Sequence, residues 1–227
     1  MTIEREPPRD CPLCPRLRTF ILEQREAHPD WHNAPVPTLE PASRDHVRLL
    51  VVGLAPGLRG ANRTGRAFTG DWAGRLLYDT LIAHGFAEGP FEERPDDRLS
   101  LIDVAVTNAV RCVPPQNKPV GAEIRTCRTF LEATIGAYGA LTHVLCLGRI
   151  SHDSTVRALG GRLVDHPFGH GAVHALGELE LRDSYHCSRY NTNTGVLTAS
   201  MFSDVVESIR AAIDADPRPR SGTVGEP

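Results

Sequence analysis

The stretch His46-Val-Arg-Leu-Leu-Val-Val52, followed at once by Gly53-Leu-Ala-Pro-Gly57, decides the fold class of this chain. The first part is a short apolar run with β-branched residues, which is typical of a buried strand. The glycines that follow allow the backbone to approach a ligand closely, and their N–H groups can face an anion or a carbonyl group. The segment therefore predicts a buried strand followed by a glycine-rich loop, which taken alone is either an ordinary tight turn or a ligand-facing loop.

Strand-like and helix-like segments alternate on both sides of this stretch. Further strands are expected at Leu101–Val110, at His143–Leu147 and at Leu181–Tyr185, and Gly161–Leu181 is expected to hold a strand pair turning at Phe168–Gly171. Helices are expected at Pro15–Ala27, Asp71–His84, Ala122–Tyr138, from Gly148 to about Leu159, and at Val196–Ile213. Such alternation predicts an α/β fold, a three-layer α/β/α sandwich with a central, largely parallel sheet. Residues 1–213 are expected to form one domain, and residues 214–227 a disordered tail.

Composition limits the class of protein. The first ten residues are charged and contain proline, and no apolar run reaches the length of a membrane span, so we expect a cytoplasmic monomer with no membrane contact. The net charge of −3 gives no global basic field. However, 24 of the 25 basic residues are arginine, which binds phosphate in a bidentate manner, so one basic face is compatible with the acidic total.

Four cysteines form a pattern typical of a metal site. Cys11 and Cys14 are two residues apart, and Cys112 and Cys127 follow about a hundred residues later. In a reducing compartment, clustered cysteines are more often ligands than disulfides. Four thiolates suit zinc and an iron–sulfur cluster equally, so the spacing leaves both open.

Three polar segments follow predicted strand ends and should converge, because ligands of such sheets bind beyond the carboxyl ends of the strands. They run from Gly53 to Asp71, from Asn108 to Pro119 and from His186 to Thr194. None of them fits the phosphate-loop or the dinucleotide-binding pattern. The segments therefore predict a site of another kind at this edge of the sheet.

Taken together, the motifs resemble those of family 5 (type b) uracil-DNA glycosylases, in the same order across residues 11 to about 210. They are Cys11-Pro-Leu-Cys14-Pro-Arg-Leu, Gly53-Leu-Ala-Pro-Gly57, Asn62-Arg-Thr-Gly-Arg-Ala-Phe-Thr-Gly-Asp71, Asn108-Ala-Val-Arg-Cys112-Val-Pro-Pro-Gln-Asn-Lys-Pro119, Cys127, Leu147-Gly-Arg-Ile150, His166-Pro-Phe-Gly-His-Gly171 and Ser184-Tyr-His186-Cys-Ser-Arg-Tyr-Asn-Thr192. Family 4 has an acidic residue where this chain has Leu54, which places the resemblance with family 5.

The resemblance implies a DNA repair enzyme that flips uracil, and other deaminated bases such as hypoxanthine, out of DNA. It hydrolyses the N-glycosidic bond, leaves an abasic site and so initiates base excision repair. It assigns catalysis to Asp71, His186 and Asn117: Asp71 orients water, His186 donates to the base O2, and Asn117 reads the base. The base-binding residues are Gly53, Leu54, Ala55, Gly57, Phe68, Asn108, Asn117 and His186. Simpler alternatives stay open, since Asp71 is also a good helix N-cap, and Phe68 and Asn108 are also ordinary buried residues.

For DNA contact, the candidates beside the motifs are Arg59, Arg63, Arg66, Ser188, Arg189, Tyr190 and Asn191. Tyr190 departs from the smaller polar residue of the family and is a candidate wedge in the space of the flipped base. The resemblance also implies a structural [4Fe–4S] cluster on Cys11, Cys14, Cys112 and Cys127, which ties residues 11–14 to the domain, with zinc as the alternative. The competing functions are a noncatalytic Fe–S protein that binds or senses nucleic acid and a small zinc interaction module.

Overall fold

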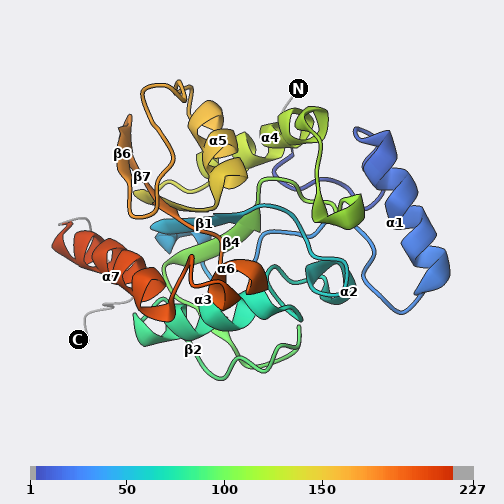
Figure 1. Cartoon of the computed structure of the whole chain (residues 1–227), viewed down its shortest axis with the longest axis horizontal. Coiled ribbons are helices and arrows are strands. Elements are labelled where there is room, and N and C mark those ends of the chain that lie inside the picture. Colours follow the sequence, from blue (N-terminus) through green and yellow to red (C-terminus); the bar gives the residue numbers. More distant parts are fainter. Residues whose placement is uncertain (1–3, 217–227) are drawn as a thin grey trace, which may run out of the picture.

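A five-stranded sheet lies at the centre of the computed structural model, which describes residues 4–216 (Figure 1). Its strands, in spatial order, are β4 (Val104–Asn108), β1 (Leu49–Gly53), β5 (His143–Leu147), β7 (Leu179–Ser184) and β6 (Val173–Leu176). The first four are mutually parallel, and only the edge strand β6 pairs antiparallel, with β7. The predicted largely parallel sheet is therefore confirmed.

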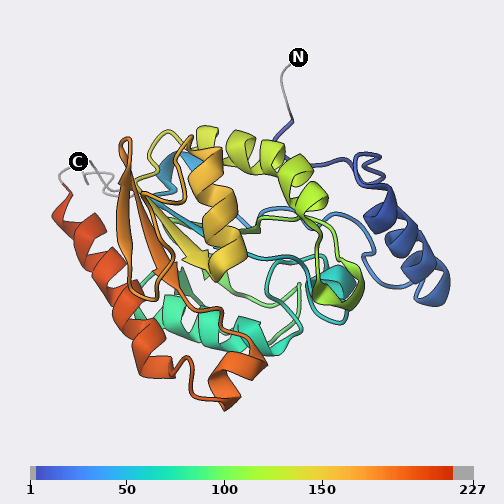
Figure 2. The ribbon, with the colours of Figure 1, turned by 45° about the horizontal axis from the view of Figure 1, so that its top comes forward.

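Helices cover both faces of the sheet and complete three layers (Figure 2). One face packs against α3 (Trp72–Ala83) and α7 (Ala199–Ala215), the other against α4 (Gly121–Gly136) and α5 (Arg149–Ala158). Alternate residues of β1 serve the two layers: Leu49 and Val51 join the first core, and Leu50 and Val52 the second. This is why the strand reads as an uninterrupted apolar run. No helix among the described residues is long and apolar enough to cross a membrane.

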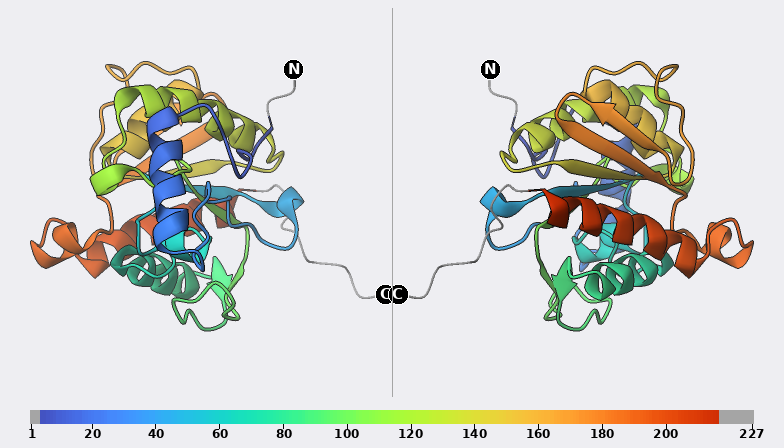
Figure 3. Two further views of the ribbon diagram at one scale, coloured as in Figure 1. Left: turned by 90° about the vertical axis from the view of Figure 1, so that its right-hand side faces the viewer. Right: turned by 90° about the vertical axis from the view of Figure 1, so that its left-hand side faces the viewer.

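Helix α1 (Pro15–Ala27) lies beside the sheet rather than on either face, as Figure 3 also shows. Its bounds match the prediction, and Leu17 and Ile21 are its buried residues. Several short elements were not predicted, because they are too short to show a periodic pattern. They are η1 (Arg44–His46), α2 (Ala61–Thr64), β2 (Ala87–Glu88), β3 (Ser100–Leu101), η2 (Pro115–Asn117) and α6 (Arg189–Asn193).

Three predicted boundaries are wrong. The run Leu101–Val110 is divided at Asp103, whose left-handed φ of 57° breaks the strand and separates β3 from β4. The strand pair turns at Gly177, with φ 64°, and not at Phe168–Gly171. The last helix starts later than expected, where Thr198 accepts a hydrogen bond from the Met201 N–H, and it extends to Ala215. The predicted tail therefore begins too early, and its residues 217–227 lie outside the described part.

Candidate active site

An open cavity of about 790 Å³ lies beyond the carboxyl ends of the parallel strands. Its wall comes from the loops after β1, β4, β5 and β7 and from the start of α3. Nine of the predicted residues line it: Leu54, Ala55, Gly57, Arg59, Asp71, Asn117, His186, Ser188 and Arg189. Residues that are far apart in the sequence thus meet where parallel strands end, as predicted.

Asp71 is held at the start of α3 as its N-cap. One carboxylate oxygen accepts a hydrogen bond of 3.3 Å from the Gly74 N–H, while the other lies against the backbone of Gly57 and Gly60. Burial raises the pKa of Asp71 above its ordinary value, and the N–H groups of Gly74 and Ala73 oppose that rise. The capping role is therefore real, and the carboxylate still faces the cavity.

His186 follows β7 and lies opposite the loop after β1. Burial lowers the pKa of its imidazole to about 4, so the ring is neutral near pH 7 and carries one N–H donor. Its Nδ1 is buried and has no hydrogen-bond partner among the described residues. The ring stacks against Phe68 with a centroid separation of 6.1 Å. This arrangement provides a neutral imidazole with one N–H donor beside the Phe68 ring.

Gly53, Phe68 and Asn108 meet directly behind this wall. A Cβ atom on Gly53 would lie 2.4 Å from the Phe68 ring and 2.5 Å from the Asn108 Oδ1, so only glycine allows the three to pack together. Phe68 has a left-handed φ of 52°, and Gly74 lets α3 approach its carbonyl group. All three predicted residues therefore lie at the site, although none of them is on the surface of the open cavity. Their contact with a base stays a prediction.

Asn117 stands at the rim of the cavity on a strained turn. Both Gln116 and Asn117 have φ of 56°, a left-handed conformation that costs free energy in residues other than glycine. The turn is held from outside by Arg16 on α1, which donates to the Lys118 carbonyl over 3.1 Å and pairs with Glu123. Glu123 in turn accepts from the Val120 N–H. The N-terminal segment thus fixes the loop that carries Asn117.

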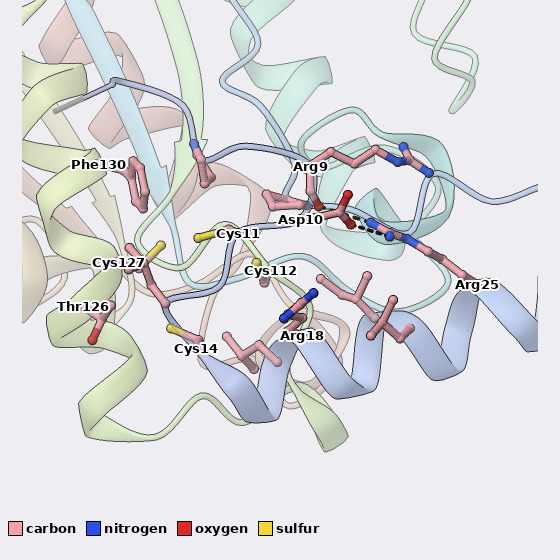
Figure 4. Close-up of a pocket in the computed structure, with 16 residues that line it drawn as sticks. Arg9, Asp10, Cys11, Cys14, Arg18, Arg25, Cys112, Thr126, Cys127 and Phe130 are labelled. Atoms are coloured by element: carbon pink, nitrogen blue, oxygen red, sulfur yellow. Dashed lines mark hydrogen bonds and ion pairs between the residues drawn. The ribbon is translucent and has the colours of Figure 1, made fainter.

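The four predicted cysteines line one hollow between the start of α1 and α4, and their side chains come together there (Figure 4). Cys11 and Cys14 come from the N-terminal segment, Cys112 from the loop after β4, and Cys127 from α4. The Arg111 N–H donates to the Cys127 sulfur over 3.3 Å. Burial raises the pKa of the Cys14 thiol to about 11 and also raises the pKa of Cys112 and Cys127. Because burial favours the protonated thiols, these cysteines would become thiolates only on binding a cation.

The predicted arginines do not behave alike. Arg59 lines the cavity, and Arg63 borders an adjacent hollow together with His28 and Trp31. Arg66 is buried, pairs with Asp97 at 2.8 Å and packs over the rings of Tyr78 and Phe91. The prediction that Arg66 binds DNA phosphate is therefore wrong, because its guanidinium group is used inside the protein.

The segment Ser188–Asn191 forms the cap and first turns of α6. The Ser188 side chain accepts from the Asn191 N–H, and Tyr190 is 73% exposed. The Asn191 amide donates to the His186 carbonyl over 2.9 Å, so this side chain orients the His186 backbone, a role not predicted from the sequence. Arg189 and Tyr190 are both exposed, and their contact with DNA stays a prediction.

Among the cavity residues that were not predicted as site residues, two carry a polar group on the side chain, Trp72 and Arg149. Trp72 fits the apolar helix pattern of α3, yet it is 52% exposed and lines the cavity. It donates from Nε1 to the Thr192 hydroxyl over 2.9 Å, and Arg189 lies over its ring. Arg149 lines the cavity at the start of α5. Their positions beside Asp71 and Gly148, both in quoted motifs, were the available signals.

Comparison with known proteins places these observations in context. The sequence model of the Uracil DNA glycosylase superfamily matches residues 41–210. A type-5 uracil-DNA glycosylase of Thermus thermophilus is 42% identical over 86% of this chain and 90% of its own length. Another, from Pyrobaculum aerophilum, is 35% identical over 91% of this chain and 89% of its own length. A type-4 uracil-DNA glycosylase of that organism is 32% identical over only 50% of each chain.

Proposed function

The chain belongs to the uracil DNA glycosylase superfamily and, within it, to the type-5 uracil-DNA glycosylases, and from that premise we propose that it excises uracil from DNA. The reaction is hydrolysis of the N-glycosidic bond, which leaves an abasic site and begins base excision repair. The observation that carries this proposal is the convergence of Asp71, Asn117 and His186 on one cavity at the sheet edge.

The geometry fits the charges that develop during this reaction. As the bond breaks, negative charge moves onto the base and the sugar becomes oxocarbenium-like, so a donor is needed at the base oxygen and an anion near the sugar. A neutral His186 supplies an N–H donor without adding a full positive charge. Asp71, once ionised, orients the attacking water and offsets the charge on the sugar. Since its carboxylate is fixed by backbone N–H groups, little reorganisation is required.

Base recognition falls to residues on both sides of the cavity wall. Asn117 presents an amide at the rim, and the Phe68 ring, which lies beside His186 behind the cavity wall, is the proposed stacking face for the base. Leu54 contributes an apolar side chain in place of a charge, which favours a pocket that accepts other deaminated bases, hypoxanthine included. The backbone from Gly53 to Gly57 supplies the close contacts.

A gel assay tests this function and its range. DNA duplexes carrying uracil, hypoxanthine or thymine are incubated with the protein, and abasic sites are cleaved with alkali. We expect cleavage at uracil, loss of that cleavage in the His186→Ala variant, and no loss in an Arg162→Ala control on the exposed Arg162–Asp165 pair. DNA binding with no abasic product at any base would instead identify a noncatalytic nucleic-acid-binding protein.

For the four cysteines we propose a structural [4Fe–4S] cluster rather than zinc. In a tetrahedral zinc site, Zn–S bonds of about 2.3 Å place the sulfurs about 3.8 Å apart. Among the described residues, the only ligand group with all atoms within 4.8 Å does not include these cysteines. Four sulfurs of which no three lie within 4.8 Å of one another, with an N–H donor to one of them, fit a larger cluster better.

The proposed cluster has no redox step in hydrolysis. Its place is to hold Cys11 and Cys14 against Cys112, in the same loop as Asn117. A brown protein with iron and sulfide in equal amounts and absorbance in the visible blue supports it. A colourless protein with one zinc per chain refutes it. We further propose that the enzyme acts as a monomer on cytoplasmic DNA. Light scattering of the pure protein, which gives its mass in solution, tests the monomeric state.

A further inference from the structure

A second group of ligand-type side chains lies away from the cysteines, between α5 and the β6–β7 hairpin. His152 on α5, His174 on β6 and Asp183 on β7 bring two ring nitrogens and a carboxylate oxygen within 4.8 Å of one another. It is the one such group in the part of the chain that the structure describes. Asp183 and His152 are fully buried, and the side chain of His174 is 11% exposed. Nothing in the excision reaction uses these three residues.

The contacts of the His152 ring require either a proton or a metal ion between its Nδ1 and Asp183. Its Nε2 lies 2.9 Å from the His166 carbonyl oxygen, and because a carbonyl only accepts, Nε2 carries a proton. Its Nδ1 lies 2.8 Å from a carboxylate oxygen of Asp183. In the neutral ring, the Nδ1 lone pair would face that oxygen, so either a second proton or a metal ion must lie there. A backbone carbonyl on the far nitrogen is also the usual support of a metal-binding histidine.

The position of His174 distinguishes between a shared proton and a metal ion. Its Nε2 is buried, has no hydrogen-bond partner among the described residues, and lies 3.6 Å from the second oxygen of Asp183. A proton shared by His152 and Asp183 leaves that nitrogen unsatisfied, which costs free energy in a buried site. A metal ion between the three side chains would use its lone pair. The orphaned nitrogen therefore favours a metal ion.

We propose that His152, His174 and Asp183 bind a divalent transition-metal cation of the zinc class through Nδ1, Nε2 and a carboxylate oxygen. Two imidazoles and one carboxylate are the ligands that such borderline cations prefer, and calcium or magnesium would favour oxygen ligands alone. Three protein ligands leave one position for water. The approach to the site passes His174 on the edge strand, since the other two ligands are covered.

The site is placed to brace the catalytic histidine. Asp183 lies near the end of β7, three residues before His186, and α5 starts at Arg149 on the cavity wall. His170, which lies in the loop before β6, accepts a hydrogen bond from the Tyr185 N–H over 3.2 Å. The backbone just after β7 is therefore also held by a histidine from this loop. A bound ion would join α5, β6 and β7 and restrict the motion of the segment that carries His186. This role is independent of whether the base excised is uracil.

Zinc titration of the cluster-loaded protein tests the proposal, because iron then occupies the cysteines. Calorimetry with ZnCl2 should show one ion per chain and a rise in melting temperature of several degrees. The His174→Gln variant should bind at least 10-fold more weakly and lose the shift, whereas a His46→Gln control on η1 should match the wild type. His174→Gln removes no hydrogen bond from Nε2, so its circular dichroism without zinc should be unchanged.

Two results overturn the proposal. One is equal zinc affinity and equal melting shift in the wild type and in His174→Gln, which would place the zinc elsewhere. The other is no stoichiometric zinc uptake by the wild type itself, a result that needs no variant to fold. Either outcome would leave His152 and Asp183 as a buried, protonated ion pair.

Discussion

At the residue scale, the packing behind the wall of the candidate active site depends on the missing side chain of Gly53. We expect Gly53→Ala to lower stability by about 1–3 kcal/mol, because its Cβ would come within 2.5 Å of both the Phe68 ring and the Asn108 amide. Denaturant unfolding measures this change. Gly139→Ala is the matched control, since a Cβ there meets nothing within 4 Å, and it should change stability by less than about 0.5 kcal/mol. A Gly53→Ala protein as stable as this control would contradict the packing.

Asp71 caps α3 and has a proposed chemical role, and replacing it with asparagine separates the two. The Asp71→Asn side chain would still cap α3, because asparagine is as good an N-cap as aspartate. It cannot act as an anion beside the sugar, so we expect excision by Asp71→Asn to fall at least about 100-fold. Single-turnover rates on a uracil duplex measure this loss. A rate within a few-fold of the wild type would remove Asp71 from the mechanism.

The same substitution has a predictable effect on stability. The pKa of Asp71 is raised in the folded protein, mainly by burial, so the folded state holds its proton more tightly than the unfolded chain does. Wild-type stability is therefore lost as pH rises from the ordinary carboxyl pKa through the raised one. Asp71→Asn lacks this loss. The melting temperature of Asp71→Asn should equal or exceed that of the wild type at pH 7. Near pH 3, this difference in melting temperature should disappear.

At the scale of elements, the N-terminal helix controls the loop that carries Asn117. Arg16 bonds the Lys118 carbonyl and Glu123, and through Glu123 it supports the start of α4. Arg16→Met should speed hydrogen exchange of the amides from Lys118 to Glu123 and lower kcat/KM several-fold, with the cysteine cluster retained. Glu23→Gln, on an exposed position of the same helix away from the cysteines, should leave both unchanged. An unchanged rate of hydrogen exchange in Arg16→Met would show that the turn carrying Asn117 is stable without Arg16.

Tyr190 belongs to the short helix α6 and stands out from it, 73% exposed. If its ring fills the space of the flipped nucleotide, Tyr190→Ala should reduce flipping of a fluorescent reporter base by about 10-fold, as expected from about 1–3 kcal/mol of lost stacking. Val164→Ala, equally exposed, is the control. Normal flipping in Tyr190→Ala would rule out a wedge.

The parts of the site that could be predicted from the sequence are those fixed by local chemistry. The apolar run of β1 and the glycines after it specify a buried strand and a close-approach loop, and Asp71 specifies a helix start. The convergence of these parts followed from parallel strands ending at one edge of the sheet. None of this required knowledge of a distant partner.

Residues whose role depends on a distant partner could not be predicted. Arg66 looks like its neighbours Arg59 and Arg63, and only its pairing with Asp97, 31 positions away, makes it structural. Trp72 follows the helix period, but its indole lies at the cavity, where it donates a hydrogen bond to Thr192 on the short helix α6. The short elements α2 and α6 likewise depend on tertiary packing, because isolated helices of that length are unstable.

At the scale of the whole molecule, an acidic protein must still bind a polyanion. The net charge is −3, yet Arg59, Arg149 and Arg189 line the cavity from three different segments, and Arg63 lies beside it. Buried and paired arginines such as Arg66 take no part in this face. Arginines therefore gather at and beside the cavity although the net charge of the chain is negative.

This arrangement predicts how salt acts on DNA binding. Each phosphate neutralised by an arginine releases counterions, so affinity should fall steeply as salt rises from about 50 to 200 mM. Each of Arg59→Ala, Arg149→Ala and Arg189→Ala should reduce the slope of log K against log salt by about 1, measured by fluorescence anisotropy. Arg66→Ala should leave the slope unaltered while lowering stability, because its charge already pairs with Asp97. Equal slopes for Arg66→Ala and Arg59→Ala variants, both reduced, would mean that the buried pair opens on DNA.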